Sequence, residues 1–520
     1  MSTLLLPLGA RFNCALCGEC CKRWDITFSE REFAELKARD WVSLFPELAG
    51  EVLFEREKRD RWFGPRTYRF ALQENKACAF LEADSGKCRM HARFGGNIKP
   101  LVCRFFPFTF TEASVGTFVG LRFNCPAVVA GSGQSLEAQR EDILGLVKAL
   151  RKSRPLPASG APAATSEIFF TRRQKLWWSE IVEIESHLLR ALRLGMAAPS
   201  ALPRGGGDND EPEADGDTAS EAGKRQAPDH AQPDGKGDAP WGGPAKSGRE
   251  LLDRILLGAR LIDLLSTARL EKVRRERLAE FVALVWEGAR AEHAEARKAL
   301  GLDAPADSPP TGDRDAQTAR PSPSRADTLV FRQFLCYFFN REYLGHHKKS
   351  FFGRFRALGF SVLKNNLRFA FGRGQLRFGD LPSPVNIRAV SAFETSELPV
   401  ESAELLHRYF ITKLEGKNAV GELFFDQSYV DGYYFLMVLV STAIWFARCS
   451  ALGHGRDRIL HEDVVWAVRY VDSSFGSTTA LGSFRERMKI YALTLPERAQ
   501  TLLAAMCLPA RNQPAGKDSV

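Results

Sequence analysis

Four cysteines within the first 21 residues constrain this chain more than any other feature. They form the run CALCGECC with the spacing C-x2-C-x2-C-C, and they are Cys14, Cys17, Cys20 and Cys21. Two intervening residues let a chain bend so that two sulfurs face one metal. Consecutive steps of this kind are typical of the runs that hold iron–sulfur clusters. Because vicinal cysteines are awkward disulfide partners and nothing else marks a secreted chain, the run predicts a metal or cluster site rather than a disulfide framework.

The other seven cysteines fall into two groups. Four lie in the first quarter of the chain and are further ligand candidates: Cys78, Cys88, Cys103 and Cys125. Three stand alone in apolar surroundings and are expected in the core, since free cysteine behaves as a small hydrophobe: Cys336, Cys449 and Cys507. Eight thiols suffice for two four-thiolate sites, or for one cluster with spare thiols. Because adjacent side chains diverge, Cys20 and Cys21 are not expected to bind one ion together, so Cys21 serves a second site or stays free.

Thiolates suit both zinc and iron–sulfur clusters. A structural zinc site usually has two CxxC pairs, whereas nine residues separate Cys78 from Cys88. The three cysteines at x2 steps, with Cys103 as a distant fourth ligand, favour a 4Fe-4S cluster, and zinc stays the alternative. His91 is either a further ligand or an ordinary histidine near the site.

Separated sequence blocks around these cysteines resemble a known family. They are Phe12, Gly18, CAFL at 78–81, GKC at 86–88 with His91 after it, CRFFPF at 103–108 and NCP at 124–126. Over about residues 10–130 they resemble the CxxCxxCC cysteine-cluster family, a zinc- or iron-chelating domain. That family includes flagellin lysine N-methylases, whose start the segment 20–26 resembles. The resemblance therefore implies metal binding, and as an alternative an S-adenosylmethionine-dependent protein lysine N-methyltransferase.

Arg104 directly follows a ligand candidate and is the candidate cofactor-binding residue. Its guanidinium could bind the carboxylate of S-adenosylmethionine, or it could neutralise thiolate charge or cap a helix. Nucleotide-loop and hydrolase signatures are missing from the sequence. Three hypotheses follow: a cluster that supports modification of a partner protein, a metal-handling protein, and a structural metal site on a helical interaction platform.

Composition and periodicity predict a mainly α fold. We expect a small cysteine-rich α+β domain over 1–135, packed on helical segments at 136–195, 249–302 and 327–508. The segments 196–248 and 303–326 are rich in Gly, Pro, Asp and Ala, and are predicted to be disordered linkers because they cannot bury enough apolar surface. Alternation predicts strands at 67–72 and 117–123. Helical spacing predicts one helix at 167–193 and two within 249–300.

The apolar stretch 432–453 is predicted to be a buried central helix and not a membrane span, because its continuous apolar core is short. The first residues lack a signal peptide pattern, so we expect a cytoplasmic protein.

Residues 346–378 combine eight Lys or Arg with seven Phe and no acid. Either this segment binds an acidic protein partner or a membrane surface, or its apolar residues pack inward: Phe352, Phe355, Leu363 and Leu367. The net charge of +9 is modest, and motifs for specific nucleic-acid binding are missing.

Overall fold

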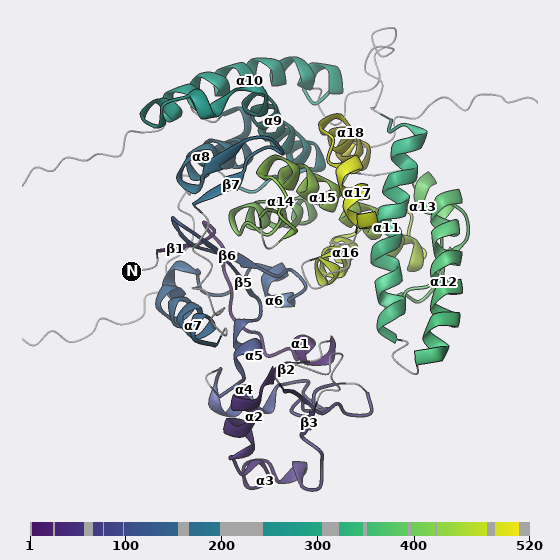
Figure 1. Cartoon of the computed structure of the whole chain (residues 1–520). Coiled ribbons are helices and arrows are strands. Elements are labelled where there is room, and N and C mark those ends of the chain that lie inside the picture. The colour runs from purple at the N-terminus through teal and green to yellow at the C-terminus, as the bar shows by residue number, and fades with distance from the viewer. Residues whose placement is uncertain are drawn as a thin grey trace, which may run out of the picture.

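Two separate hydrophobic cores organise the chain, a small one near the amino terminus and a large one in a helical body. The structure is a computed structural model. It describes residues 3–23, 26–56, 66–75, 77–96, 98–153, 166–197, 243–303, 322–346, 351–393, 397–421, 424–475 and 484–508. Figure 1 shows the small domain, with α1 to α5, below the helical body. The predicted mainly α fold with a small amino-terminal α+β domain is confirmed.

The elements follow one another with these bounds. The strands are β1 (Leu4–Leu5), β2 (Thr27–Ser29), β3 (Phe54–Arg56), β4 (Thr67–Phe70), β5 (Phe108–Ala113), β6 (Gly116–Leu121), β7 (Glu167–Phe169), β8 (Lys175–Trp177), β9 (Gln375–Leu376) and β10 (Val385–Asn386). The helices are α1 (Glu19–Arg23), α2 (Glu30–Lys37), α3 (Trp41–Leu44), α4 (Arg89–Phe94), α5 (Leu101–Phe105), α6 (Pro126–Ala130), α7 (Arg140–Ser153), α8 (Trp178–Leu194), α9 (Gly248–Thr267), α10 (Leu278–Leu300), α11 (Arg325–His346), α12 (Phe351–Phe371), α13 (Ile387–Ala392), α14 (Val400–Glu415), α15 (Tyr429–Gly453), α16 (His461–Ser474), α17 (Phe484–Leu493) and α18 (Pro496–Cys507).

The small domain is an antiparallel sheet in the order β2–β4–β3, covered by short helices. Its core is aromatic: the ring of Phe80 lies 5.2 Å from that of Phe70 and 4.9 Å from that of Trp41. Helix α2 begins at a capping box, in which Ser29 Oγ accepts from the Glu32 N–H and the Glu32 carboxylate accepts from the Ser29 N–H. These rings supply much of the apolar contact in such a small core.

The second sheet, in the order β1–β6–β5, belongs to the helical body. Strands β5 and β6 form an antiparallel hairpin, and β1 pairs with β6 in parallel. Phe118 packs on Trp178 of α8, with ring centroids 5.4 Å apart, and Phe123 packs edge-on against Tyr409 of α14 at 5.1 Å. The buried residues of the large core therefore include Leu4, Ala10 and Phe12 as well as residues from Phe108 onward, on both sides of the small core in sequence.

Helix α15 is the central element of the body. It is long and apolar enough to cross a membrane, but 94% of its most apolar window is buried in protein. Ser428 caps its start, since Ser428 Oγ accepts from the Asp431 N–H. The prediction of a buried central helix at 432–453 is confirmed.

The helix predicted over 167–193 begins only at Trp178, so its first part was wrong. Strands β7 and β8 form a hairpin in which Ile168 lies opposite Leu176. Ile168 and Leu176 are buried, whereas Phe169 and Trp177 are exposed. This alternation has the two-residue period of a strand, and it outweighs the helical spacing of the aromatic residues. The two helices predicted within 249–300 are α9 and α10.

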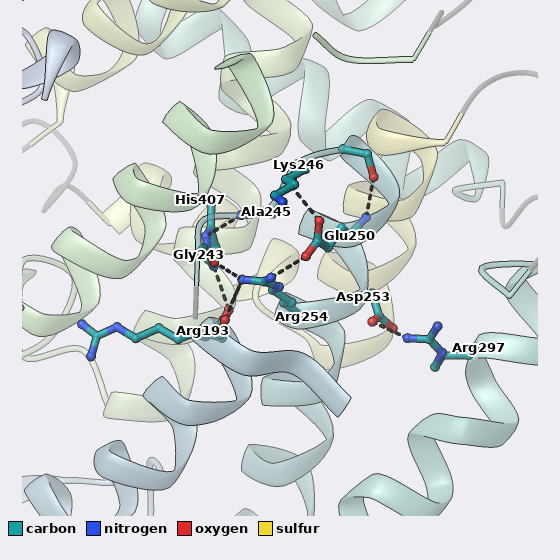
Figure 2. A network of polar contacts seen from close by, with 11 residues as sticks. Arg193, Gly243, Ala245, Lys246, Glu250, Asp253, Arg254, Arg297 and His407 are labelled. Atoms are coloured by element: carbon teal, nitrogen blue, oxygen red, sulfur yellow. Dashed lines mark hydrogen bonds and ion pairs between the residues drawn. The ribbon is translucent and has the colours of Figure 1, made fainter. Parts of the chain in front are cut away.

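Most of the two predicted linkers lies outside the described residues, at 198–242 and 304–321. Residues 243–247, however, pack against the body in a polar network (Figure 2). The Ala245 N–H donates to His407 Nδ1 at 3.1 Å, and Arg254 donates to the Gly243 carbonyl at 2.6 Å. Residues 243–247 therefore belong to the packed body, because their backbone satisfies buried side chains of α9 and α14.

The inward packing expected within 346–378 is wrong for the two leucines that the structure describes. Leu363 is 55% exposed and Leu367 is 48% exposed, whereas Asn365 and Phe369 are buried. Helix α12 packs on α11 through this other face, where Asn365 donates to Asn340 Oδ1 at 2.9 Å. The side chains of Phe352 and Phe355 lie outside the described ones.

Candidate metal centre

The CALCGECC run enters the small domain as a loop followed by α1. Two of its residues have left-handed backbone, Leu16 at φ 55° and Gly18 at φ 67°. A Cβ on Gly18 would lie 2.2 Å from the carbonyl oxygen of Gly86, so only glycine fits where the loop crosses the 82–86 turn. The Cys21 N–H then donates to the Gly18 carbonyl at 2.8 Å. This turn directs the last two cysteines toward the core of the domain.

Backbone hydrogen bonds hold the second cysteine-bearing segment against the first. The Cys78 N–H donates to the Cys21 carbonyl at 2.9 Å. Gln73 Nε2 donates to the carbonyls of Cys78 and Leu81, at 3.1 and 2.7 Å. A β-bridge between Leu81 and Cys88 closes the intervening loop. Cys78 and Cys88, with nine residues between them in sequence, are thereby brought to one place.

Short helices set the positions of the last two candidate ligands in the domain. Cys88 is the N-cap of α4, and Cys103 lies in α5. The carboxylate of Glu32 accepts from the Leu101 N–H at 2.8 Å, so the residue that caps α2 also holds the start of α5. Glu32 therefore connects the sheet side of the domain with the helix that carries Cys103.

Five cysteines line one pocket, together with Lys99 and apolar side chains. The thiols belong to Cys20, Cys21, Cys78, Cys88 and Cys103, and the apolar wall includes Ile26, Phe70, Met90, Val102 and Phe106. The sulfurs of Cys20 and Cys21 lie 3.9 Å apart. Sulfur donors in an apolar wall, beside the ammonium group of Lys99, suit a thiophilic metal.

The cysteine thiols of this pocket shift one another's pKa. Hydrogen bonding by the Cys21 thiol, the nearby Lys99 ammonium and the backbone at the start of α4 lower the pKa of Cys88 to about 6. The Cys21 hydrogen bond also lowers the pKa of Cys20, and the pKa of Cys21 itself is raised because it donates. Burial raises the pKa of Cys103. The Cys88 thiol is thus poised as a thiolate, the form that binds metal.

Three predicted ligands lie outside this pocket. Cys14 and Cys17 are exposed on the loop, and Cys125 is buried at the N-cap of α6, in the core of the body. Within the described residues, no three histidine, cysteine, aspartate or glutamate side chains are gathered tightly enough to hold one metal ion as they stand. Metal binding therefore requires the thiols of the pocket to move closer together.

Two other predicted residues lie beside the pocket rather than in its wall. Arg104 is half-buried on α5 and is not among the side chains that line the pocket. His91 accepts a hydrogen bond from Lys99 at its Nδ1, at 2.6 Å, and burial together with the Lys99 charge lowers its pKa. This contact agrees with the second of the two expectations for His91, an ordinary histidine near the site.

Sequence reasoning missed Lys99, the basic residue that does line the pocket. It stands four residues before Cys103, and no motif distinguished it from other surface lysines. Glu32 was missed as well, although the pattern Ser29-x-x-Glu32 signals a capping box. The second role of Glu32, at Leu101, depends on tertiary structure.

With the cysteine geometry known, comparison with known proteins gives one match. Residues 13–126 match the CxxCxxCC family, described as "Putative zinc- or iron-chelating domain". The resemblance expected over about residues 10–130 is therefore confirmed. No curated protein and no solved structure matches the chain. The CxxCxxCC match covers the small domain and the β5–β6 hairpin, and the remainder of the helical body lies beyond it.

Proposed function

We propose that the thiol pocket of the small domain binds zinc or an iron–sulfur cluster. The observation that carries this proposal is the convergence of five cysteines, from segments up to 83 residues apart (20 to 103), on one pocket. The family match to a zinc- or iron-chelating domain supports it. Chance placement of thiols would not bring them together through backbone hydrogen bonds, a β-bridge and two helix starts.

The residues of the pocket fit such a group. Thiolate sulfur is the preferred donor for zinc and for iron–sulfur clusters. Several thiolates around one centre carry excess negative charge, which Lys99 offsets. A bound metal would link the chain segments of a small core, and so stabilise it.

Metal analysis of the full chain, purified without oxygen, tests this proposal. We expect zinc or iron in the wild-type protein and clearly less of it in Cys78→Ser and Cys103→Ser. Cys336→Ser is the matched control, because that cysteine is buried in the helical body. Visible charge-transfer absorption would identify an iron–sulfur cluster, the form that the ligand spacing favours, whereas zinc would give none. A metal-free wild-type protein that also fails to take up either metal would contradict the proposal.

Methyl transfer from S-adenosylmethionine is a separate proposal, and it comes from the family resemblance. It assigns the carboxylate of that cofactor to Arg104. Calorimetric titration of metal-loaded protein tests it, with weakened binding expected in Arg104→Ala. Lack of binding at millimolar cofactor would contradict it and leave metal binding unaffected.

The cellular setting also belongs to the proposal. Free thiols persist in a reducing compartment, which supports a cytoplasmic location.

A contact with an acidic protein or a membrane surface is supported by helix α12, where Leu363, Leu367 and Phe371 are exposed next to Lys364 and Arg373. No specific nucleic acid is proposed as a partner.

A further inference from the structure

An arginine of the helical body connects two cysteine-bearing segments. Arg469 of α16 donates to Glu19 Oε2 at 2.8 Å and to the Asn124 carbonyl at 3.4 Å. Glu19 directly precedes Cys20, and Asn124 directly precedes Cys125. One guanidinium therefore links the side chain of the residue before Cys20 with the backbone of the residue before Cys125.

The Asn124 segment is fixed from its other side by a buried ion pair. Asp472, one turn after Arg469, accepts from the Asn124 N–H at 3.1 Å. It also pairs with Lys413 of α14 at 2.6 Å, and Lys413 donates to the Leu121 carbonyl at 3.0 Å. Lys413 and Asp472 are both buried. Because an unpaired charge there would be costly, this arrangement sets the position of Cys125 firmly.

The beginning of the CALCGECC run is attached to the same region. The Phe12 N–H donates to the Gln134 carbonyl at 2.9 Å, and Gln139 Nε2 donates to the Phe12 carbonyl at 2.8 Å. Gln134 lies just after α6, the helix that Cys125 caps. The loop that carries Cys14 and Cys17 thus starts beside the end of α6 and ends, through Glu19, beside its beginning.

The eight thiols divide according to the core to which they belong. Cys21, Cys78 and Cys88 lie in the core of the small domain, with Cys20 and Cys103 packed against it, whereas Cys125 lies in the core of the body. Cys14 and Cys17 are exposed and belong to neither core. Burial raises the pKa of Cys125 to about 11, and charge at Cys17 and Cys20 adds to this effect, in agreement with their proximity.

We propose that Cys14, Cys17, Cys20 and Cys125 form a second thiolate metal site, at the junction of the small domain and the helical body, with Arg469 as its positioning residue. This inference rests on the proposed function, and it assigns the pocket centre to Cys21, Cys78, Cys88 and Cys103. Neighbouring Cys20 and Cys21 then serve different centres. A metal at the second site takes ligands from both sides of the junction, and so fastens the cysteine domain to the body.

Counting zinc equivalents tests this assignment. Reduced, metal-free full-length chain is titrated with Zn²⁺ in competition with a chromophoric chelator, without oxygen. We expect two tight equivalents for the wild type and one for Cys14→Ser, whose exposed side chain is not needed for packing. Cys125→Ser should also retain one, and so should Cys78→Ser. The double variant Cys14→Ser/Cys78→Ser should retain none.

Arg469→Ala should weaken one of the two equivalents at least tenfold and leave the other unchanged. The matched control is Lys22→Ala, because Lys22 pairs with the other oxygen of Glu19 at 3.0 Å and is exposed. A wild type with one equivalent, or a Cys14→Ser variant that keeps two, would overturn the second site while the proposed function stands. A wild type with no tight equivalent would overturn the proposed function itself.

Discussion

At the scale of single residues, Gly18 is the position in the CALCGECC loop where the backbone packs directly against the Gly86 carbonyl. Its positive φ and the nearby Gly86 carbonyl leave no space for a side chain. We predict that Gly18→Ala displaces the loop and lowers zinc affinity at least about tenfold, equivalent to about 1.4 kcal/mol. Gly9→Ala is the matched control, since Gly9 also has positive φ (74°) but an added Cβ meets nothing within 4 Å. Equal zinc affinities in competition titrations of the two variants would contradict this account of the loop.

His407 gives the helical body a specific sensitivity to acid. Its Nδ1 accepts from the Ala245 N–H and its Nε2 contacts the Leu192 carbonyl at 2.8 Å, a pairing that requires the neutral ring. Burial, with the charge of Arg254 nearby, lowers its pKa to about 3. The unfolded chain binds a proton at this histidine below about pH 6.5, whereas the folded chain does not, so stability falls as the pH decreases from 6.5 toward 3.

We predict that His407 costs the folded chain about 2 kcal/mol of stability at pH 5 relative to pH 7. The measurement is the free energy of unfolding by urea at both pH values, for the wild type and for His407→Gln. The variant should lose less stability on acidification by about that amount. His187, whose pKa burial lowers to about 4, contributes to both proteins and cancels in the comparison. If the free energy of unfolding fell equally on acidification in the wild type and in His407→Gln, the His407 ring would be protonated in the folded chain, and the prediction would be contradicted.

Among the secondary-structure elements, α12 shows how far periodicity predicts packing. Its apolar residues allow more than one buried face, and the sequence favoured the face with Leu363 and Leu367. The contacts of α11 select the face with Asn365 and Phe369 instead. The β7–β8 hairpin is a similar case, because Ile168, Phe170, Leu176 and Trp178 fit a two-residue period that a helical reading overlooks. Helix α15 was predictable because it is apolar on every side.

The exposed leucines of α12 lead to a direct comparison of stability. We predict that Leu363→Ala/Leu367→Ala changes the free energy of unfolding by less than about 1 kcal/mol, as is usual for surface positions. Phe369→Ala should cost about 3–5 kcal/mol, because it leaves a cavity in the core. Urea denaturation of the three proteins provides the measurement. A large loss of unfolding free energy in the double leucine variant would contradict the exposure of these leucines and favour the inward packing that the sequence suggested.

For the molecule as a whole, the sequence identified the candidate metal-binding cysteines, but it could not show which of them lie in the small domain and which in the helical body. Cys78 and Cys103 were expected near the CALCGECC run, and the pocket contains them with Cys20 and Cys21. The exposed position of Cys14 and Cys17 and the place of Cys125 in the body core depend on contacts across the whole chain. Arg469 is more than 340 residues from Asn124 along the chain, so no local pattern connects them. Tertiary structure is what assigns each thiol to a side of the junction.

The central claim is that cysteine sulfur binds metal in this chain. X-ray absorption spectroscopy at the metal edge of the loaded protein tests it most directly, because it reports the atoms bound to the metal. For zinc we predict a shell of about four sulfur atoms at about 2.3 Å. For a cluster we predict a sulfur shell with further iron neighbours beyond it. A shell made mainly of oxygen and nitrogen would contradict the account, since the metal would then be bound away from the cysteines.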